Sequence, residues 1–208
     1  MIDINGLLLI ILSLVCLGLA SYAFYKYSLT QSDPLFIVGV SLSTIGVSIF
    51  FGYLNVLPLG GITLNVNWLW YAGTSIGLLF LFLISIMKTN EHMRQLRRFQ
   101  VFATLLFLLL VLSTPMLPPA SDPLVPALLN LARPLICTCA FIRYASLYIS
   151  KETRFSLFMS FAFLLLGVGF GVITPQLLMP GLAALGGVGS VLRLTGYSTM
   201  IIAYTMAR

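Results

Sequence analysis

Two arginines, Arg133 and Arg193, lie deep inside long apolar runs of the sequence. At about 1.5 Å per helical residue, both lie about 15–17 Å from the amino-terminal ends of those runs. An arginine at the centre of a bilayer costs about 2.5–3.5 kcal/mol, so it usually faces the protein interior or a partner. Asn130 lies one helical turn before Arg133. These three residues are therefore the predicted contacts for an anion, supplied either by a ligand, lipid headgroup or cofactor, or by another subunit.

A structural role for the arginines is the alternative. Each guanidinium would then bond helix carbonyls, near Pro134 or in the stretch Gly186-Gly-Val-Gly189, or extend outward to the interface. The sequence leaves these interpretations open, because no acidic residue lies inside an apolar run. The five acidic residues are Asp3, Asp33, Glu91, Asp122 and Glu152.

The apolar runs lack the residues that a metal site, a haem site or a catalytic site would need. The single histidine, His92, lies in a charged segment, which excludes a bis-histidine haem or a histidine-bound zinc within the apolar runs. Cys137 and Cys139 are two residues apart and point to different faces of a helix. The serines of the runs have no buried base beside them, and the runs contain no carboxylate for a proton relay. We expect a protein that is not an enzyme and has no metal site.

The composition is that of an integral membrane protein. The 208 residues are 60% hydrophobic and only 8% charged, where roughly 25% charge is usual in soluble domains. Apart from Arg133 and Arg193, the basic residues behind the net charge of +6 lie at or near the ends of apolar runs. There they meet anionic lipid headgroups, so we expect no nucleic acid partner. The predicted location is a cell inner membrane, crossed several times.

Seven apolar runs are long enough to span a bilayer as helices. The sequence therefore predicts an all-α fold, a seven-helix transmembrane bundle that forms a single domain over 1–208. The predicted helices are 5–26, 34–56, 68–88, 98–117, 124–149, 154–177 and 182–206.

Basic residues occur in alternate connections between these runs. The connections 58–67, 118–123 and 175–181 contain no lysine or arginine. The positive-inside rule then puts the amino terminus outside and the carboxyl terminus in the cytoplasm. We expect a cytoplasmic basic surface made of Lys88, Arg94, Arg97, Arg98, Lys151 and Arg154.

The two halves of the chain share short matches. Ala23-Phe-Tyr-Lys-Tyr27 is similar to Ala140-Phe-Ile-Arg-Tyr144, and Ile45-Gly46 is similar to Leu166-Gly167. The matching segments are separated by about 120 residues in each case, which indicates a parallel duplication of a three-helix unit around a linker helix.

In topology, this 3+1+3 arrangement resembles the microbial rhodopsins and the sugar-transporting PQ-loop family. The first resemblance implies retinal, but a Schiff base is excluded because 182–206 contains no lysine. The second implies a Pro-Gln pair in each repeat, whereas Pro175-Gln176 is unmatched in the first half. The chain also resembles the seven-helix sensory modules of bacterial kinases and cyclases, which continue into a signalling domain.

Two classes of function follow. The first is a non-enzymatic binding or interaction module, either a sensory module or an accessory subunit with a protein partner in the membrane or at its cytoplasmic face. The alternative is a small-solute carrier or anion pathway lined by Arg133 and Arg193. Glycines in the last two runs indicate close helix packing, or space for a lipid, carotenoid or quinone.

Overall fold

The computed structural model describes residues 4–54, 67–87, 89–113, 124–178 and 184–206, whose regular structure is entirely α-helical. The helices are α1 (Ile4–Thr30), α2 (Asp33–Leu54), α3 (Asn67–Ile86), α4 (Asn90–Ser113), α5 (Leu124–Lys151), α6 (Arg154–Leu178) and α7 (Ala184–Met206). Five of them, α1 to α4 and α6, are long and apolar enough to cross a membrane. The all-helical prediction is confirmed, and the chain is consistent with a membrane protein. Seven crossings and their orientation stay predictions.

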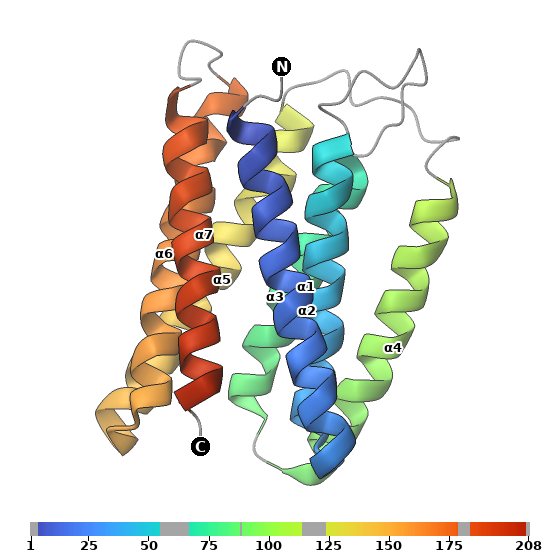
Figure 1. Cartoon of the computed structure of the whole chain (residues 1–208), viewed down its shortest axis with the longest axis vertical. Helices are drawn as coiled ribbons and strands as arrows, with labels where there is room; N and C mark the ends of the chain where they lie inside the picture. The colour runs from blue at the N-terminus through green and yellow to red at the C-terminus, as the bar shows by residue number, and fades with distance from the viewer. Residues whose placement is uncertain (1–3, 55–66, 88, 114–123, 179–183, 207–208) are drawn as a thin grey trace. The chain divides into compact units, whose positions relative to one another are not determined.

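The helices belong to two compact units, Met1–Asp122 and Pro123–Arg208, and each is described by itself. In the first unit, α2 packs against both α1 and α3, and α4 packs against α2 and α3 (Figure 1). In the second unit, α6 packs against both α5 and α7. The middle helices α2 and α6 therefore have neighbours on two sides, and they position the side chains of the helices beside them.

Helix α4 differs most from the sequence prediction, because it begins at Asn90 rather than at residue 98. The Oγ1 of Thr89 accepts the N–H of His92 at 3.4 Å, and its carbonyl accepts the N–H of Met93 at 3.1 Å, as an N-cap does. Glu91 in the first turn favours the positive end of the helix dipole. Most of the predicted charged connection is therefore helix, and His92 lies in it.

The α1–α2 and α5–α6 turns have the same backbone construction. A residue with positive φ follows each helix, Gln31 at 52° and Glu152 at 49°. Each donates its N–H to the carbonyl four residues earlier at 2.7 Å, as in the αL caps that end many helices. The next residue, Ser32 or Thr153, accepts an N–H from the first turn of the following helix, at 3.3 and 3.2 Å. The first residues of α2 and α6 therefore occupy equivalent places.

Two glycines aligned by the predicted duplication lie at equivalent helix contacts. A Cβ on Gly46 of α2 would lie 2.9 Å from Cγ of Leu17 on α1. A Cβ on Gly167 of α6 would lie 3.3 Å from Cβ of Cys137 on α5. Both glycines allow a close approach to the preceding helix. The duplication itself stays a prediction.

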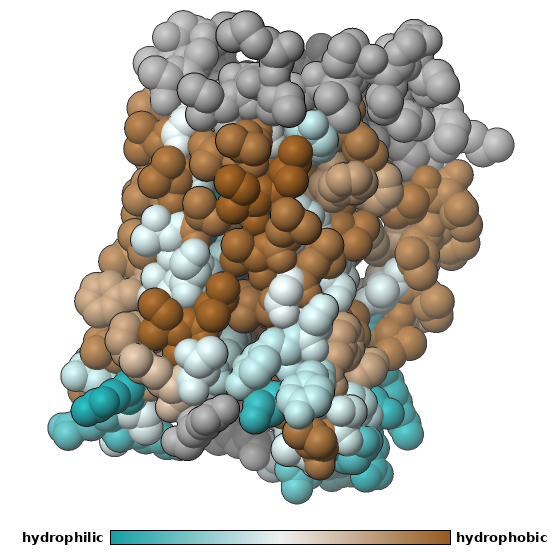
Figure 2. All heavy atoms as spheres, viewed as in Figure 1, coloured by the Kyte–Doolittle hydropathy of each residue, from teal (hydrophilic) through white to brown (hydrophobic). Residues whose placement is uncertain are grey.

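Hydrophilic side chains in each unit gather at the helix ends where these turns lie, and the middle of the helices is hydrophobic, on the face seen in Figure 2. The exposed basic residues Arg94 and Arg98 lie at this end of the first unit, and Lys151 and Arg154 at this end of the second. Such a distribution is expected of helices that end at a membrane surface.

Candidate functional site

Arg133 of α5 and Arg193 of α7 both lie against the aromatic ring of Phe170 on α6. Their guanidinium carbons are 5.3 and 5.4 Å from the ring centre. The side chains are buried, with exposed fractions of 0% for Arg133 and 2% for Arg193. The negative face of an aromatic ring attracts a cation, and more strongly when water is excluded. The two predicted arginines therefore share one neighbour inside the second unit.

Asn130 connects Arg133 to α6. Its Oδ1 accepts a hydrogen bond from Nη1 of Arg133 at 3.1 Å. Its Nδ2 donates to the carbonyl of Phe170 at 3.2 Å and to Oγ1 of Thr174 at 2.7 Å. Because the oxygen and the nitrogen of the Asn130 amide are both hydrogen-bonded, the amide fixes the guanidinium of Arg133 relative to the backbone that carries Phe170. The role of Asn130 is thus to position Arg133.

Arg193 donates two hydrogen bonds to its own helix. Its Nε donates to the carbonyl of Gly189 at 3.3 Å, and its Nη2 donates to Oγ of Ser190 at 2.9 Å. Ser190 in turn donates to the carbonyl of Gly186 at 2.9 Å. The bond to Gly189 is of the kind that the structural interpretation of Arg193 expects. The bond to Ser190 leaves the guanidinium directed at the ring of Phe170, which the sequence interpretation did not include.

Glycines on α6 and α7 make room for the Arg193 side chain. A Cβ on Gly169 would lie 2.9 Å from Cγ of Arg193, and a Cβ on Gly189 would lie 2.7 Å from the carbonyl oxygen of Gly169. Cβ atoms do not approach other heavy atoms so closely, so only glycine fits at either position. Close helix packing, predicted from the glycines of these runs, is therefore what lets a long charged side chain fit between α6 and α7.

The second unit has a large excess of positive charge. In the sequence 123–208, six basic residues stand against one acidic residue: Arg133, Arg143, Lys151, Arg154, Arg193 and Arg208 against Glu152. Glu152 is exposed in the α5–α6 turn. Arginine keeps its proton in proteins, so a pair of buried guanidiniums is suited to binding an anion and not to acid–base chemistry.

The predicted basic surface divides into different environments. Arg97 forms an ion pair with Asp33, with Nη1 and Oδ1 2.6 Å apart, and its guanidinium lies 5.2 Å from the ring centre of Phe36. Arg94 and Arg98 are exposed on α4. Lys151 and Arg154 line a cavity at the α5–α6 turn. Lys88 lies outside the described residues, as does Asp122.

Phe170, Thr174 and Ser190 were missed by the sequence predictions. Phe170 lies between two glycines, Gly169 and Gly171. An aromatic residue flanked by glycines inside an apolar run is the one sequence signal that could have identified it. In the part of the chain that the structure describes, no three metal-ligating side chains lie together.

Comparison of the chain with protein-family models, with curated proteins and with solved structures finds no match.

Proposed function

We propose that the protein is a non-enzymatic binding module of a membrane, in which Arg133 and Arg193 bind the anionic group of an apolar molecule. The observation that carries this proposal is the convergence of two buried guanidiniums on the ring of Phe170. Both belong to the same compact unit. A sensory module and an accessory subunit are the two forms that this function takes.

The geometry favours recognition of a carboxylate or a phosphate. Guanidinium groups present planar arrays of N–H donors that match these anions, and burial strengthens each charged hydrogen bond. Asn130 and Ser190 hold the two guanidiniums in place before a ligand arrives. Preorganised donors lose little entropy on binding. The apolar surroundings of the site suit a ligand with a hydrocarbon body, such as a lipid or a fatty acid.

The first test compares two probes with the same hydrocarbon chain, oleate and oleyl alcohol. Thermal unfolding of the full chain is followed in a neutral detergent, with each probe at the same mole fraction in the micelles. Oleate is expected to raise the unfolding temperature by a few degrees, and oleyl alcohol to leave it unchanged. An equal response to both probes would overturn the proposal.

Substitutions of the arginines test whether oleate stabilises the protein by binding to Arg133 and Arg193. Arg133→Gln and Arg193→Gln are expected to abolish the effect of oleate. Arg143→Gln removes one positive charge from the same helix outside the site, and it should keep the effect. Each variant is first checked for native helix content by circular dichroism. The carrier alternative gives a different result: flux of an anion into vesicles that contain the protein, lost in the same two variants.

A further inference from the structure

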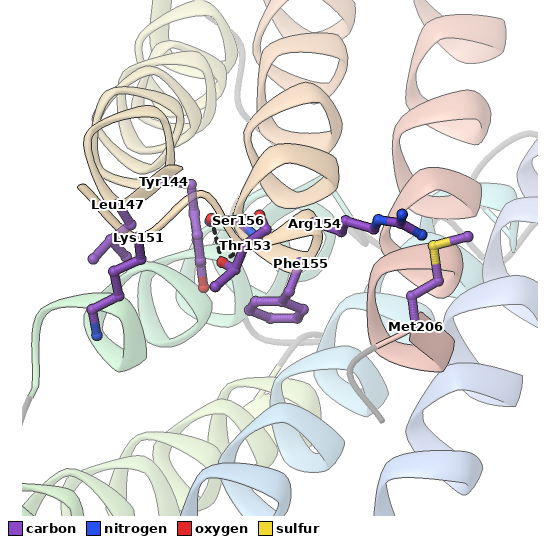
Figure 3. Close-up of a pocket in the computed structure, with 8 residues that line it drawn as sticks. All are labelled: Tyr144, Leu147, Lys151, Thr153, Arg154, Phe155, Ser156 and Met206. Carbon is purple, nitrogen blue, oxygen red and sulfur yellow. Dashed lines mark hydrogen bonds between the residues drawn. The ribbon is translucent and has the colours of Figure 1, made fainter. Parts of the chain in front are cut away.

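Residues of the α5–α6 turn line a cavity of about 510 Å³, and neither Arg133 nor Arg193 lines it. Tyr144, Lys151, Arg154, Phe155 and Met206 are among the residues that line it (Figure 3). Lys151 lies at one side and Arg154 at the other, with Tyr144 and Phe155 between them. Tyr144 is three helical turns beyond Arg133 on α5, which is about 16 Å along the helix axis.

The charge of this turn is opposite to that of its counterpart in the first unit. The first residue of α2 is Asp33, and Arg97 from α4 is bonded to it. The equivalent first residue of α6 is Arg154, and Lys151 stands three residues before it. Glu152 lies in the same turn, but it is exposed and does not line the cavity.

Tyr144 adds a second and independent observation. Its side chain is only 4% exposed. The ring is stacked on Phe163, with centroids 5.6 Å apart, and meets Phe155 edge-on at 6.2 Å. This packing fixes the ring, and its hydroxyl lies at the cavity that Lys151 and Arg154 also line, with the charged ends of these two side chains directed to opposite sides (Figure 3). None of the described residues forms a hydrogen bond with that hydroxyl, so an O–H donor on a fixed ring is available to a ligand at the cavity.

We infer that this cavity binds a phosphate group. Lys151 and Arg154 supply two positive charges from opposite sides, and the Tyr144 hydroxyl donates a hydrogen bond to a phosphate oxygen. The positive amino-terminal end of α6 adds to the same field. The phosphate has two sources, the headgroup of an anionic lipid or phosphate free in solution. The apolar side chains of Phe155 and Met206 at the cavity suit the first of these.

The experiment measures lipid retention on the full chain by native mass spectrometry. The protein is exchanged into neutral detergent that contains equal amounts of phosphatidylglycerol and a neutral diacylglycerol. A parallel arm adds inorganic phosphate, or sodium chloride at the same ionic strength, and follows thermal unfolding. We expect phosphatidylglycerol to be retained at least about tenfold more than diacylglycerol, as charge-assisted hydrogen bonds predict.

Three variants tie the effect to the cavity. Arg154→Gln is expected to weaken retention about tenfold, and Tyr144→Phe about fivefold, because it removes one hydrogen bond and leaves the packing intact. Lys26→Gln removes a positive charge from α1 and is the matched control, with no expected change. Without ligand, Tyr144→Phe should unfold at the same temperature as the wild type or higher, so a loss of binding is separate from a loss of folding.

The outcomes distinguish the sources. Retention of phosphatidylglycerol that falls in Arg154→Gln and Tyr144→Phe, with no effect of inorganic phosphate, identifies a lipid headgroup at the cavity. Stabilisation by inorganic phosphate that needs Arg154 and Tyr144 identifies free phosphate. The inference is overturned if both effects are absent, or if both persist unchanged in Arg154→Gln and Tyr144→Phe. Arg133 and Arg193 are intact in these variants, so any lipid bound to the arginine pair stays bound, and the fall in retention reports on the cavity alone.

Discussion

The α1–α2 turn and the α5–α6 turn have the same backbone conformation but differ in how the charges of their side chains are balanced. In the first, Asp33 at the start of α2 is bonded to Arg97, so charge is neutralised within the unit. In the second, Arg154 takes the equivalent place beside Lys151, at the cavity. The same contrast holds for whole units. The sequence 1–122 has five basic and four acidic residues: Lys26, Lys88, Arg94, Arg97 and Arg98 against Asp3, Asp33, Glu91 and Asp122.

The second unit, with six basic residues against one acidic residue, does not balance its charge from its own sequence. Two of those basic residues, Arg133 and Arg193, are buried against the ring of Phe170. The first unit thus holds an ion pair of its own, and the positive excess of the second unit is the basis on which we propose that it binds anions. Substitutions that disturb these two arrangements should therefore differ in the size of their effects on stability and on anion binding.

The largest effect is expected where α6 and α7 approach each other around Arg193. Gly189→Ala puts a Cβ 2.7 Å from the carbonyl oxygen of Gly169, a backbone atom that cannot move alone. We expect a loss of about 1–3 kcal/mol in the free energy of unfolding, the usual cost of overpacking. The measurement is a denaturant titration in mild detergent.

Gly171→Ala is the control for this change, because a Cβ there has no atom within 4 Å. It lies on α6, close in sequence to Gly169. Its stability should equal or exceed that of the wild type, by up to about 1 kcal/mol from helix propensity. Equal destabilisation by both substitutions would contradict the close contact that buries Arg193.

A smaller effect is expected where α4 joins the first unit. Gln100 is buried, and its Nε2 donates to the carbonyl of Ile37 at 2.9 Å and to Oγ of Ser41 at 2.8 Å. Gln100→Leu keeps the volume but removes both bonds, so we expect to lose about 1–2 kcal/mol. Hydrogen exchange of α4 should rise in this variant. Gln95→Leu, at an exposed position of the same helix, should change stability by less than about 0.5 kcal/mol.

The smallest effect is expected at the ion pair of the first unit. Asp33→Asn removes the partner of Arg97, whose side chain is 42% exposed, so the pair is worth only about 0.5–1 kcal/mol. Stability should fall by that amount in low salt and by less in high salt. Asp33→Asn also leaves the positive charge of Arg97 without its carboxylate, so the first unit should gain affinity for anionic lipid. If native mass spectrometry shows no gain, the proposed difference between the two turns is wrong.

The sequence predicted most helix positions because apolar runs of this length have few other structures available. The start of α4 was missed because its charged residues were interpreted as a connection, although Thr89 is a cap and Glu91, Gln95 and the arginines favour helix. Arg133 and Arg193 were proposed as site residues because charge inside an apolar run is conspicuous, and Asn130 because it lies one turn away.

The partners of these residues on other helices were not predictable in the same way. Phe170 is shared by Arg133 and Arg193 because of how α5 and α7 are rotated against α6, and no pattern within one helix encodes that rotation. The same holds for Arg97 with Asp33, whose pairing joins α4 to α2. Tyr144 looks like any interfacial tyrosine in sequence, and only the packing of its ring gives its hydroxyl a direction.

The most direct test of the central claim is to ask whether an anionic molecule stays bound to the extracted protein, and whether its retention needs the arginine pair of the second unit. The tagged chain is extracted gently from its membrane, and native mass spectrometry compares the wild type with Arg133→Gln/Arg193→Gln, with Arg143→Gln as control. The account predicts an anionic, apolar molecule on the wild type and on the control that is missing from the double variant. The same bound species on all three proteins, or none on any of them, would contradict it.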